Sequence, residues 1–385
     1  MKLSAINPET LVRPDVAKLQ PYTPIVPFEV LTKQLERRPE DIVKLDANEN
    51  PYGPSPLVAQ ALSEAPYLHI YPDPESRELR SALAKYTGLD ARYIMVGHGA
   101  DELIDLILRL VIQAGDRIVN CPPTFGMYAF DAGINGAEVV NIWRNADFSI
   151  DLNSIIALFS ASNGRQAKNR PRADGRSEVP KVIFVTSPNN PDGSLLSDHE
   201  LEQLLTLPAL VVLDEAYVEF GGTSRVRWVT QYANLIVLRT FSKWAGLAGL
   251  RVGYGAFPLE LSQHLWKIKQ PYNVNVAGQI AARVSLADRE YLLQNVSRLI
   301  VQREQLVHTL DQFDWLEPYP GQANFILCRI IGRQAREVKH NLAEQGVLVR
   351  YYDSPGLSDH LRISIGTPTQ MARLEEALKI VSIRS

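Results

Sequence analysis

The feature of this sequence that most constrains its fold is an alternation of short apolar runs with helical stretches between residues 93 and 238. The runs are rich in branched side chains, which is typical of buried strands, and the stretches between them place apolar residues at helical spacing. This alternation predicts an α/β fold with a mainly parallel sheet and helices on both of its faces. The expected strands are Tyr93–Gly97, Arg117–Cys121, Glu138–Ile142, Lys181–Ser187, Ala209–Asp214 and Leu235–Leu238.

The two ends of the chain have a different character. Prolines are frequent in the first 42 residues, so we expect an extended arm with one helix near Phe28–Glu36. Beyond Pro258, long helical stretches lead into a compact α+β unit. The strands expected there are Ala323–Cys328, Val347–Tyr351 and Leu361–Ile365. Because 385 residues are many for one core, we expect an arm that joins the small domain (1–42), a large domain (43–275) and a small C-terminal domain (276–385).

Composition and charge exclude several classes of protein. The net charge of -3 gives no support to a nucleic-acid or membrane-surface partner. Two cysteines, Cys121 and Cys328, cannot form a disulfide framework, so we expect a reduced, cytoplasmic compartment. The chain shows no signal-peptide core, no run long enough to span a bilayer and no HExxH pattern, so we expect neither a membrane anchor nor a metal. The polar stretch 160–178 is expected to be an exposed loop.

Chemistry-bearing residues follow three of the expected strands. Gly97–Glu102 offers free N–H groups at a helix N-terminus, which suit a phosphate, although an ordinary turn capped by Asp101 explains it equally well. Asn190, fixed by the following proline, presents an amide at the edge of the sheet. Asp214 ends a buried strand, where a carboxylate needs a cation or a protonated ring, and Tyr217 can place a phenol beside it.

A fourth strand end carries a lysine among hydroxyls. Thr240, Ser242 and Lys243 follow an apolar run, small residues come next, and Arg251 suits a phosphate or carboxylate. A lone Ser-Lys pair is most often a solvated loop edge. The four strand ends together match the needs of pyridoxal phosphate, in which a lysine forms a Schiff base, an aspartate protonates the ring nitrogen, and Asn and Tyr bond the ring oxygen.

Over nearly its whole length the chain resembles the fold-type I aminotransferases of class I/II, in particular the histidinol-phosphate aminotransferase group. The resemblance implies a homodimer with shared active sites and a large pyridoxal-phosphate domain beside a smaller one. The motifs that carry it are Ala47–Gly53, Tyr71–Asp73, Gly99–Glu102, Pro122–Tyr128, Ser187–Pro191, Asp214–Tyr217, Ser242–Lys243, Ala248–Arg251 and Leu361–Gly366.

The resemblance also implies roles for single residues. Lys243, Asp214 and Tyr217 would be catalytic, with Lys243 as the Schiff-base lysine. The residues implied to hold the cofactor are Lys243, Ala100, Asp101, Phe125, Asn190, Asp214, Tyr217, Thr240, Ser242 and Arg251, together with Tyr71 from the neighbouring subunit. Those implied to hold the substrate are Arg362, Arg350, Tyr22 and Asn50. The chain departs from the usual family pattern at Asp192, where threonine is common, and at Phe125, where many relatives have tyrosine.

The activity that the resemblance implies is transamination in histidine biosynthesis, from L-histidinol phosphate and 2-oxoglutarate to imidazole-acetol phosphate and L-glutamate. A threonine-phosphate decarboxylase or an aromatic amino-acid aminotransferase could use the same scaffold, and a binding protein without turnover is a remote alternative. For Arg350 and Arg362, pairing with Asp353 or Asp359 at the surface is the alternative to substrate binding.

Overall fold

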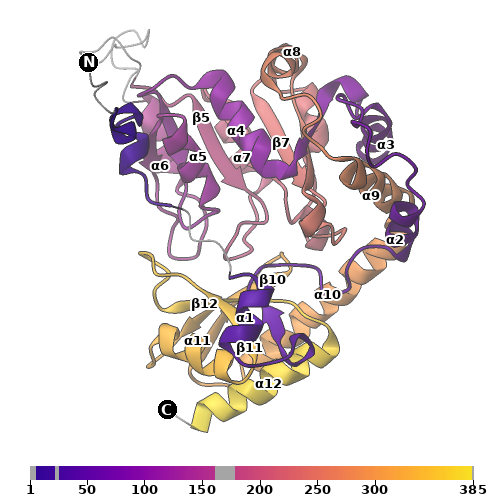
Figure 1. Cartoon of the computed structure of the whole chain (residues 1–385). Helices are drawn as coiled ribbons and strands as arrows, with labels where there is room; N and C mark the ends of the chain where they lie inside the picture. Colours follow the sequence, from indigo (N-terminus) through magenta and orange to yellow (C-terminus); the bar gives the residue numbers. More distant parts are fainter. Residues whose placement is uncertain (1–5, 22–25, 161–177, 384–385) are drawn as a thin grey trace, which may run out of the picture.

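The computed structural model describes residues 6–21, 26–160 and 178–383, so Tyr22 and most of the stretch 160–178 lie outside it. Within these residues the strands form a seven-stranded and a five-stranded sheet. Figure 1 shows the seven-stranded sheet and its helices above the five-stranded sheet, with α10 (Arg289–Leu310) running from one part to the other. The structure therefore confirms the expected α/β fold and gives it two parts.

The seven-stranded sheet has the order β2-β8-β7-β6-β5-β3-β4. Its neighbouring strands are parallel except where β8 pairs with β2 and β7. The six strands expected from the alternating pattern are all present. The bounds are β2 Ile94–His98, β3 Arg117–Asn120, β4 Glu138–Asn141, β5 Val182–Thr186, β6 Leu210–Asp214, β7 Leu235–Thr240 and β8 Val252–Ala256.

Strand β8 was not expected, because its two glycines weaken the strand signal. Its glycines serve a close approach. A Cβ on Gly253 would lie 2.4 Å from the backbone nitrogen of Ala100, at the start of α4. Glycine therefore lets β8 lie directly against the helix terminus that faces the site.

Helices cover both faces of this sheet, and the strand residues alternate between the two faces. Val182 and Phe184 of β5 pack with α4, α5 and α8, whereas Ile183 and Val185 belong to the larger core on the opposite face. The bounds are α1 Phe28–Gln34, α2 Pro56–Ser63, α3 Arg77–Thr87, α4 Gly99–Val111, α5 Met127–Ile134, α6 Leu152–Ser160, α7 Asp198–Leu205, α8 Leu259–Ile268 and α9 Val276–Ala287.

The five-stranded sheet has the order β1-β11-β12-β10-β9, and its first strand comes from the N-terminal part of the chain. Strand β1 pairs with β11, so the residues after position 42 that were expected to open the large domain lie in the smaller sheet. Helix α9, which was expected to open the small domain, packs on α2 and α3 instead. The bounds are β1 Val43–Leu45, β9 Leu316–Tyr319, β10 Phe325–Ile330, β11 Val347–Tyr351, β12 His360–Ser364, α11 Ala335–Glu344 and α12 Pro368–Ile383.

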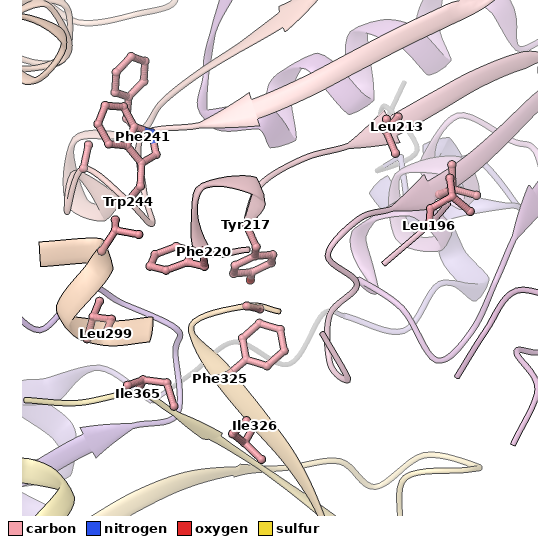
Figure 2. Close-up of a cluster of buried hydrophobic side chains, with 14 of the residues drawn as sticks. Leu196, Leu213, Tyr217, Phe220, Phe241, Trp244, Leu299, Phe325, Ile326 and Ile365 are labelled. Carbon is pink, nitrogen blue, oxygen red and sulfur yellow. The ribbon is translucent and has the colours of Figure 1, made fainter. Parts of the chain in front are cut away.

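One hydrophobic core is continuous between the two parts. Figure 2 shows Tyr217 and Phe220, which follow β6, beside Phe325 at the start of β10 and Leu299 of α10. The rings of Tyr217 and Phe325 meet edge to face with centroids 5.1 Å apart. Burial of each such side chain contributes about 1.5–3 kcal/mol, so this contact fixes the two sheets relative to each other at the site.

Candidate active site

Two adjoining cavities lie where the carboxyl ends of the seven-stranded sheet face the five-stranded sheet. The inner cavity has a volume of about 260 Å³ and reaches Asp214, Ser242 and Arg251. The outer cavity, of about 430 Å³, reaches Arg350 and Arg362. Both are lined by the same five residues, Ala47, Phe125, Asn190, Tyr217 and Lys243. Ligands in the two cavities would therefore meet at Lys243.

Lys243 follows β7 and lies between the two cavities. Its Nζ atom is 3.4 Å from the carbonyl oxygen of Ala47 and 5.7 Å from the centre of the Tyr217 ring. Burial, followed by the charge of Arg362, lowers the pKa of Lys243 to about 8. Roughly a tenth of this amine is therefore neutral and nucleophilic at pH 7, far more than for an ordinary lysine.

Asp214 ends β6 at the floor of the inner cavity and is buried. Tyr128 donates a hydrogen bond of 2.6 Å to its Oδ2 atom, and the backbone N–H of Ala216 donates one of 2.9 Å to Oδ1. Burial nevertheless raises the pKa of Asp214 to about 6. The phenol that bonds Asp214 is that of Tyr128, which the sequence did not single out, while Tyr217 lines the same cavity without a hydrogen bond to Asp214. No local pattern in the sequence identifies Tyr128 as this partner, because it reaches Asp214 from α5, a different segment of the chain.

Tyr217 lines both cavities and has a different partner. Asn48 donates from Nδ2 to the Tyr217 hydroxyl at 3.1 Å, which leaves the phenol hydrogen available to an acceptor elsewhere. Burial raises the pKa of Tyr217, so the phenol stays protonated at neutral pH. Asn50 does not line either cavity, because its amide bonds the backbone of Tyr52 and Trp244. The structure thus places Asn48 at the site in place of Asn50.

The inner cavity ends in a group of anion-binding residues. Ala100 and Asp101, in the first turn of α4, line it together with Thr240, Ser242 and Arg251. Arg251 bonds Asp101 Oδ2 through Nη2 at 2.7 Å and contacts Ser242 Oγ through Nη1 at 3.4 Å.

The backbone around Arg251 is adapted to this position. Arg251 has a φ of 53°, in the left-handed region, which is rare for a residue with a side chain. A Cβ on Gly99 would lie 2.6 Å from Arg251 Nη2, so a side chain at position 99 would displace the guanidinium. The resulting seat combines a cation, hydroxyl groups and a helix N-terminus, which are the groups that bind phosphate.

The outer cavity is cationic. Arg350 of β11 and Arg362 of β12 are paired across the sheet. Arg362 is 6% exposed, and its Nη atoms bond Asn190 Oδ1 at 2.7 Å and the carbonyl oxygen of Asp46 at 2.8 Å. No carboxylate among the described residues forms an ion pair with it. Asp359 and Asp353 pair with Arg329 and Arg336, so the surface-pairing alternative does not hold for Arg362.

The structure also places the remaining residues from the sequence. Phe125 lines both cavities, with its ring edge to face with Tyr128 at 5.6 Å. Tyr71 is 79% exposed, stacks on Tyr272 and does not line either cavity of its own chain. Asp192 is buried and accepts hydrogen bonds from Asn189 and from the backbone N–H of Ser194.

The residues of the inner cavity fit pyridoxal phosphate. They include Lys243, an amine with a lowered pKa, and Asp214, a buried carboxylate that has no cation within hydrogen-bond distance. At the far end of the cavity lie the groups that suit a phosphate. A protonated pyridine nitrogen is a cation that such a carboxylate can hold. Among the described residues no cluster of acidic, histidine or cysteine side chains suits a metal ion, and no helix is long and apolar enough to cross a membrane.

Comparison with known proteins agrees with this fold and with pyridoxal phosphate as the cofactor. The family Aminotransferase class I and II matches residues 40–378, so the chain belongs to this family of pyridoxal-phosphate enzymes. It is 52% identical over 373 residues to the chloroplastic histidinol-phosphate aminotransferase 1 of Arabidopsis thaliana, covering 96% of this chain and 86% of that protein. It is 47% identical over 380 residues to the histidinol-phosphate aminotransferase of Roseiflexus castenholzii, covering 97% and 98%.

A solved structure gives the same assignment. The histidinol-phosphate aminotransferase of Sinorhizobium meliloti, in complex with pyridoxal-5'-phosphate, superposes with a TM-score of 0.84 and is 28% identical. The match covers 97% of this chain and 98% of that one. The chain is thus an aminotransferase, and its cofactor is pyridoxal 5'-phosphate.

Proposed function

We propose that this enzyme transfers the amino group of L-histidinol phosphate to 2-oxoglutarate, forming imidazole-acetol phosphate and L-glutamate in histidine biosynthesis. The observation that carries the proposal is Arg362, a buried guanidinium without a carboxylate partner among the described residues, in a cavity that opens on Lys243. A buried cation of this kind is costly unless an anion joins it, so the outer cavity suits a substrate with an anionic end. The names of the relatives at 47–52% identity support histidinol phosphate as that substrate.

The cofactor, when bound, supplies an aldehyde carbon that captures amines and a ring that withdraws electrons from the carbon bearing the amine. Lys243 would hold the cofactor covalently, and its Nζ atom would move a proton when it is not attached to the cofactor. Its lowered pKa, about 8, suits both tasks near neutral pH. Its position between the two cavities gives it access to the cofactor and to the substrate.

Asp214, Tyr217 and Asn190 act on the cofactor ring. Asp214 would hold the proton of the ring nitrogen, because a carboxylate there favours the charged ring. Tyr217 would donate its phenol hydrogen to the ring oxygen, since its own oxygen is already an acceptor for Asn48. Asn190 donates from its amide nitrogen, because its Oδ1 atom accepts from Arg362.

The outer cavity must accept two amino donors in turn. Histidinol phosphate carries a phosphate ester where glutamate carries its α-carboxylate, and Arg362 can bind either through charge-assisted hydrogen bonds. Arg350 lies beside it on the neighbouring strand and adds a second positive charge. We expect this second charge to favour the dianionic phosphate.

The active enzyme is proposed to be a homodimer in the cytoplasm. Tyr71 lies on an exposed apolar surface that includes Tyr67, Leu68 and Ile70, and a partner subunit that covers this surface would receive Tyr71 at its own phosphate seat. Buried free thiols at Cys121 and Cys328 support a reducing compartment.

A product assay tests the proposal directly. Three reactions each contain the purified enzyme, 2-oxoglutarate and one amine, which is histidinol phosphate, threonine phosphate or phenylalanine. In each reaction the glutamate, the keto product and the carbon dioxide formed are measured. The proposal requires glutamate and keto product with histidinol phosphate at the highest kcat/KM. Release of carbon dioxide from threonine phosphate, or a preference for the aromatic amino acid, would contradict it.

A further inference from the structure

A buried chain of hydroxyl groups runs from the carboxylate of Asp214 beneath the inner cavity. Tyr128 donates to Asp214 Oδ2 at 2.6 Å, and the Tyr128 hydroxyl is 2.8 Å from Thr186 Oγ1. Thr186 Oγ1 lies 3.5 Å from Thr124 Oγ1, which donates to Asn189 Oδ1 at 2.9 Å. Tyr128 and Thr186 are 0% and 3% exposed, so the two hydrogen bonds of the Tyr128 hydroxyl are shielded from solvent, whereas Thr124 is half-buried.

The two ends of this chain determine the direction of every hydrogen bond. Ionised Asp214 can only accept, so the hydrogen of Tyr128 points to Asp214, and the hydrogen between Tyr128 and Thr186 must come from Thr186. At the other end, Asn189 donates a hydrogen bond from Nδ2 to Asp192, so the Oδ1 atom of Asn189 faces Thr124. The hydroxyl hydrogen of Thr124 is therefore donated to Asn189 Oδ1. No hydrogen remains for the contact between Thr124 and Thr186, and at 3.5 Å this is the longest contact of the chain.

The ring of Tyr128 is held by its surroundings. It stacks on Phe184 with centroids 4.9 Å apart and meets Phe125 edge to face at 5.6 Å. Tyr128 therefore contacts both the carboxylate and the aromatic ring proposed to face the cofactor. Its hydroxyl cannot leave Asp214 without disturbing this packing.

From this geometry we infer that Tyr128 and Thr186 are positioning residues that act on the reaction through Asp214. Thr186 donates to Tyr128, and Tyr128 donates to Asp214, which keeps the carboxylate ionised and aimed at the ring nitrogen. A donor polarised by a second donor makes a stronger hydrogen bond, so Thr186 acts on Asp214 only through Tyr128. The inference rests on the proposed role of Asp214 and does not depend on the identity of the substrate.

The structure provides a matched control. Thr186→Val and Thr124→Val each remove one threonine hydroxyl, and these two hydroxyls contact each other. Only Thr186 donates toward Asp214, because the hydrogen of Thr124 points to Asn189. The other charged groups that act on Asp214 are Asp101 on α4 and Lys243 after β7, and none of the variants changes them.

The experiment titrates the Asp214 carboxyl in the full-length, cofactor-free protein by carbon-13 NMR, with Asp214→Asn used to assign the signal. We expect Tyr128→Phe to raise its pKa by about one unit, the size expected for a lost hydrogen bond to a charged group. Thr186→Val should raise it by about a third of that, and Thr124→Val should leave it unchanged. In the double variant Tyr128→Phe/Thr186→Val the second change should add nothing.

The loaded enzyme gives a second readout. Tyr128→Phe should shift the acid limb of the kcat profile to higher pH and lower kcat about tenfold, with KM little changed. Equal pKa shifts in Thr186→Val and Thr124→Val would overturn the inference, as would an unshifted Asp214 in Tyr128→Phe. If Tyr128→Phe fails to fold, the difference between the Asp214 pKa values of Thr186→Val and Thr124→Val is sufficient to test the inference. If the Asp214 pKa values shift as expected but the enzyme does not use histidinol phosphate, only the proposed substrate is rejected.

Discussion

The inner and outer cavities share one lysine but differ in how their polar groups are arranged. In the inner cavity Asp214, Tyr217 and Arg251 all have fixed protein partners, and most of them follow strands of a single sheet. In the outer cavity Arg362 is held by an amide and a carbonyl oxygen, so its charge has no carboxylate partner among the described residues. The inner cavity is organised to hold one permanent ligand in one orientation. In the outer cavity the charge of Arg362 remains available to anionic substrates that bind and dissociate in each reaction cycle.

The largest effect should come from Lys243, one of the residues that line both cavities. Replacing Lys243 with Ala removes the group that attaches the cofactor and moves the proton, so turnover should fall by at least about 10⁴-fold. Mass spectrometry after borohydride reduction should find no covalent cofactor in this variant. Covalent fixation in Lys243→Ala would show that another amine fills this position.

Asp214→Ala should affect the inner cavity alone. Without the carboxylate the ring nitrogen loses its proton, and the rate of each half-reaction should fall by about 10²–10³-fold, the size expected for a lost electrostatic stabiliser. Covalent attachment of the cofactor should persist, since Lys243 is intact. Stopped-flow spectroscopy of both half-reactions measures the loss, and turnover near that of the unchanged enzyme would refute the role.

The outer cavity should respond to its two arginines in different ways. Arg362→Ala removes the shared anion site, so kcat/KM should fall for both donors by about 10–100-fold, as for a charge-assisted bond. Arg350→Ala should cost about 1–3 kcal/mol more with histidinol phosphate than with glutamate. Stopped-flow kinetics with each donor separates these effects. Equal losses for both donors in Arg350→Ala, or no loss in Arg362→Ala, would contradict the assignment.

The smallest expected effect is electrical coupling between the cavities. Burial is the main cause that lowers the pKa of Lys243 to about 8, and the charge of Arg362 is the next cause, so Arg362→Ala should raise that pKa by a fraction of a unit. With a higher pKa, less of the amine is neutral at pH 7, and cofactor-free protein should then capture pyridoxal phosphate more slowly. The pH profile of the capture rate measures this shift. An unchanged profile would mean that the two cavities are electrically independent.

Much of the inner cavity could be predicted from the sequence for a physical reason. Parallel strands bring their carboxyl ends to one edge, so residues that follow β5, β6 and β7 must converge even though they are far apart in the chain. The positions of Asn190, Asp214 and Lys243 were predictable in this way. The direct partner of Asp214 was not, because Tyr128 reaches it from α5, and no local pattern states which side chain a helix will direct at a strand end.

The sequence by itself determined the parallel sheet, the order of the strand ends and the chemistry of the cofactor site, because apolar periodicity and residue type are local properties. The tertiary structure alone decided that β1 joins the smaller sheet, that α9 packs with α2 and α3, and that Asn48 rather than Asn50 reaches Tyr217. It alone also decided that Arg362 is buried next to Asn190 instead of pairing with Asp359. These outcomes depend on which surfaces bury the most apolar area together, and that area belongs to the whole chain and not to any one segment of it.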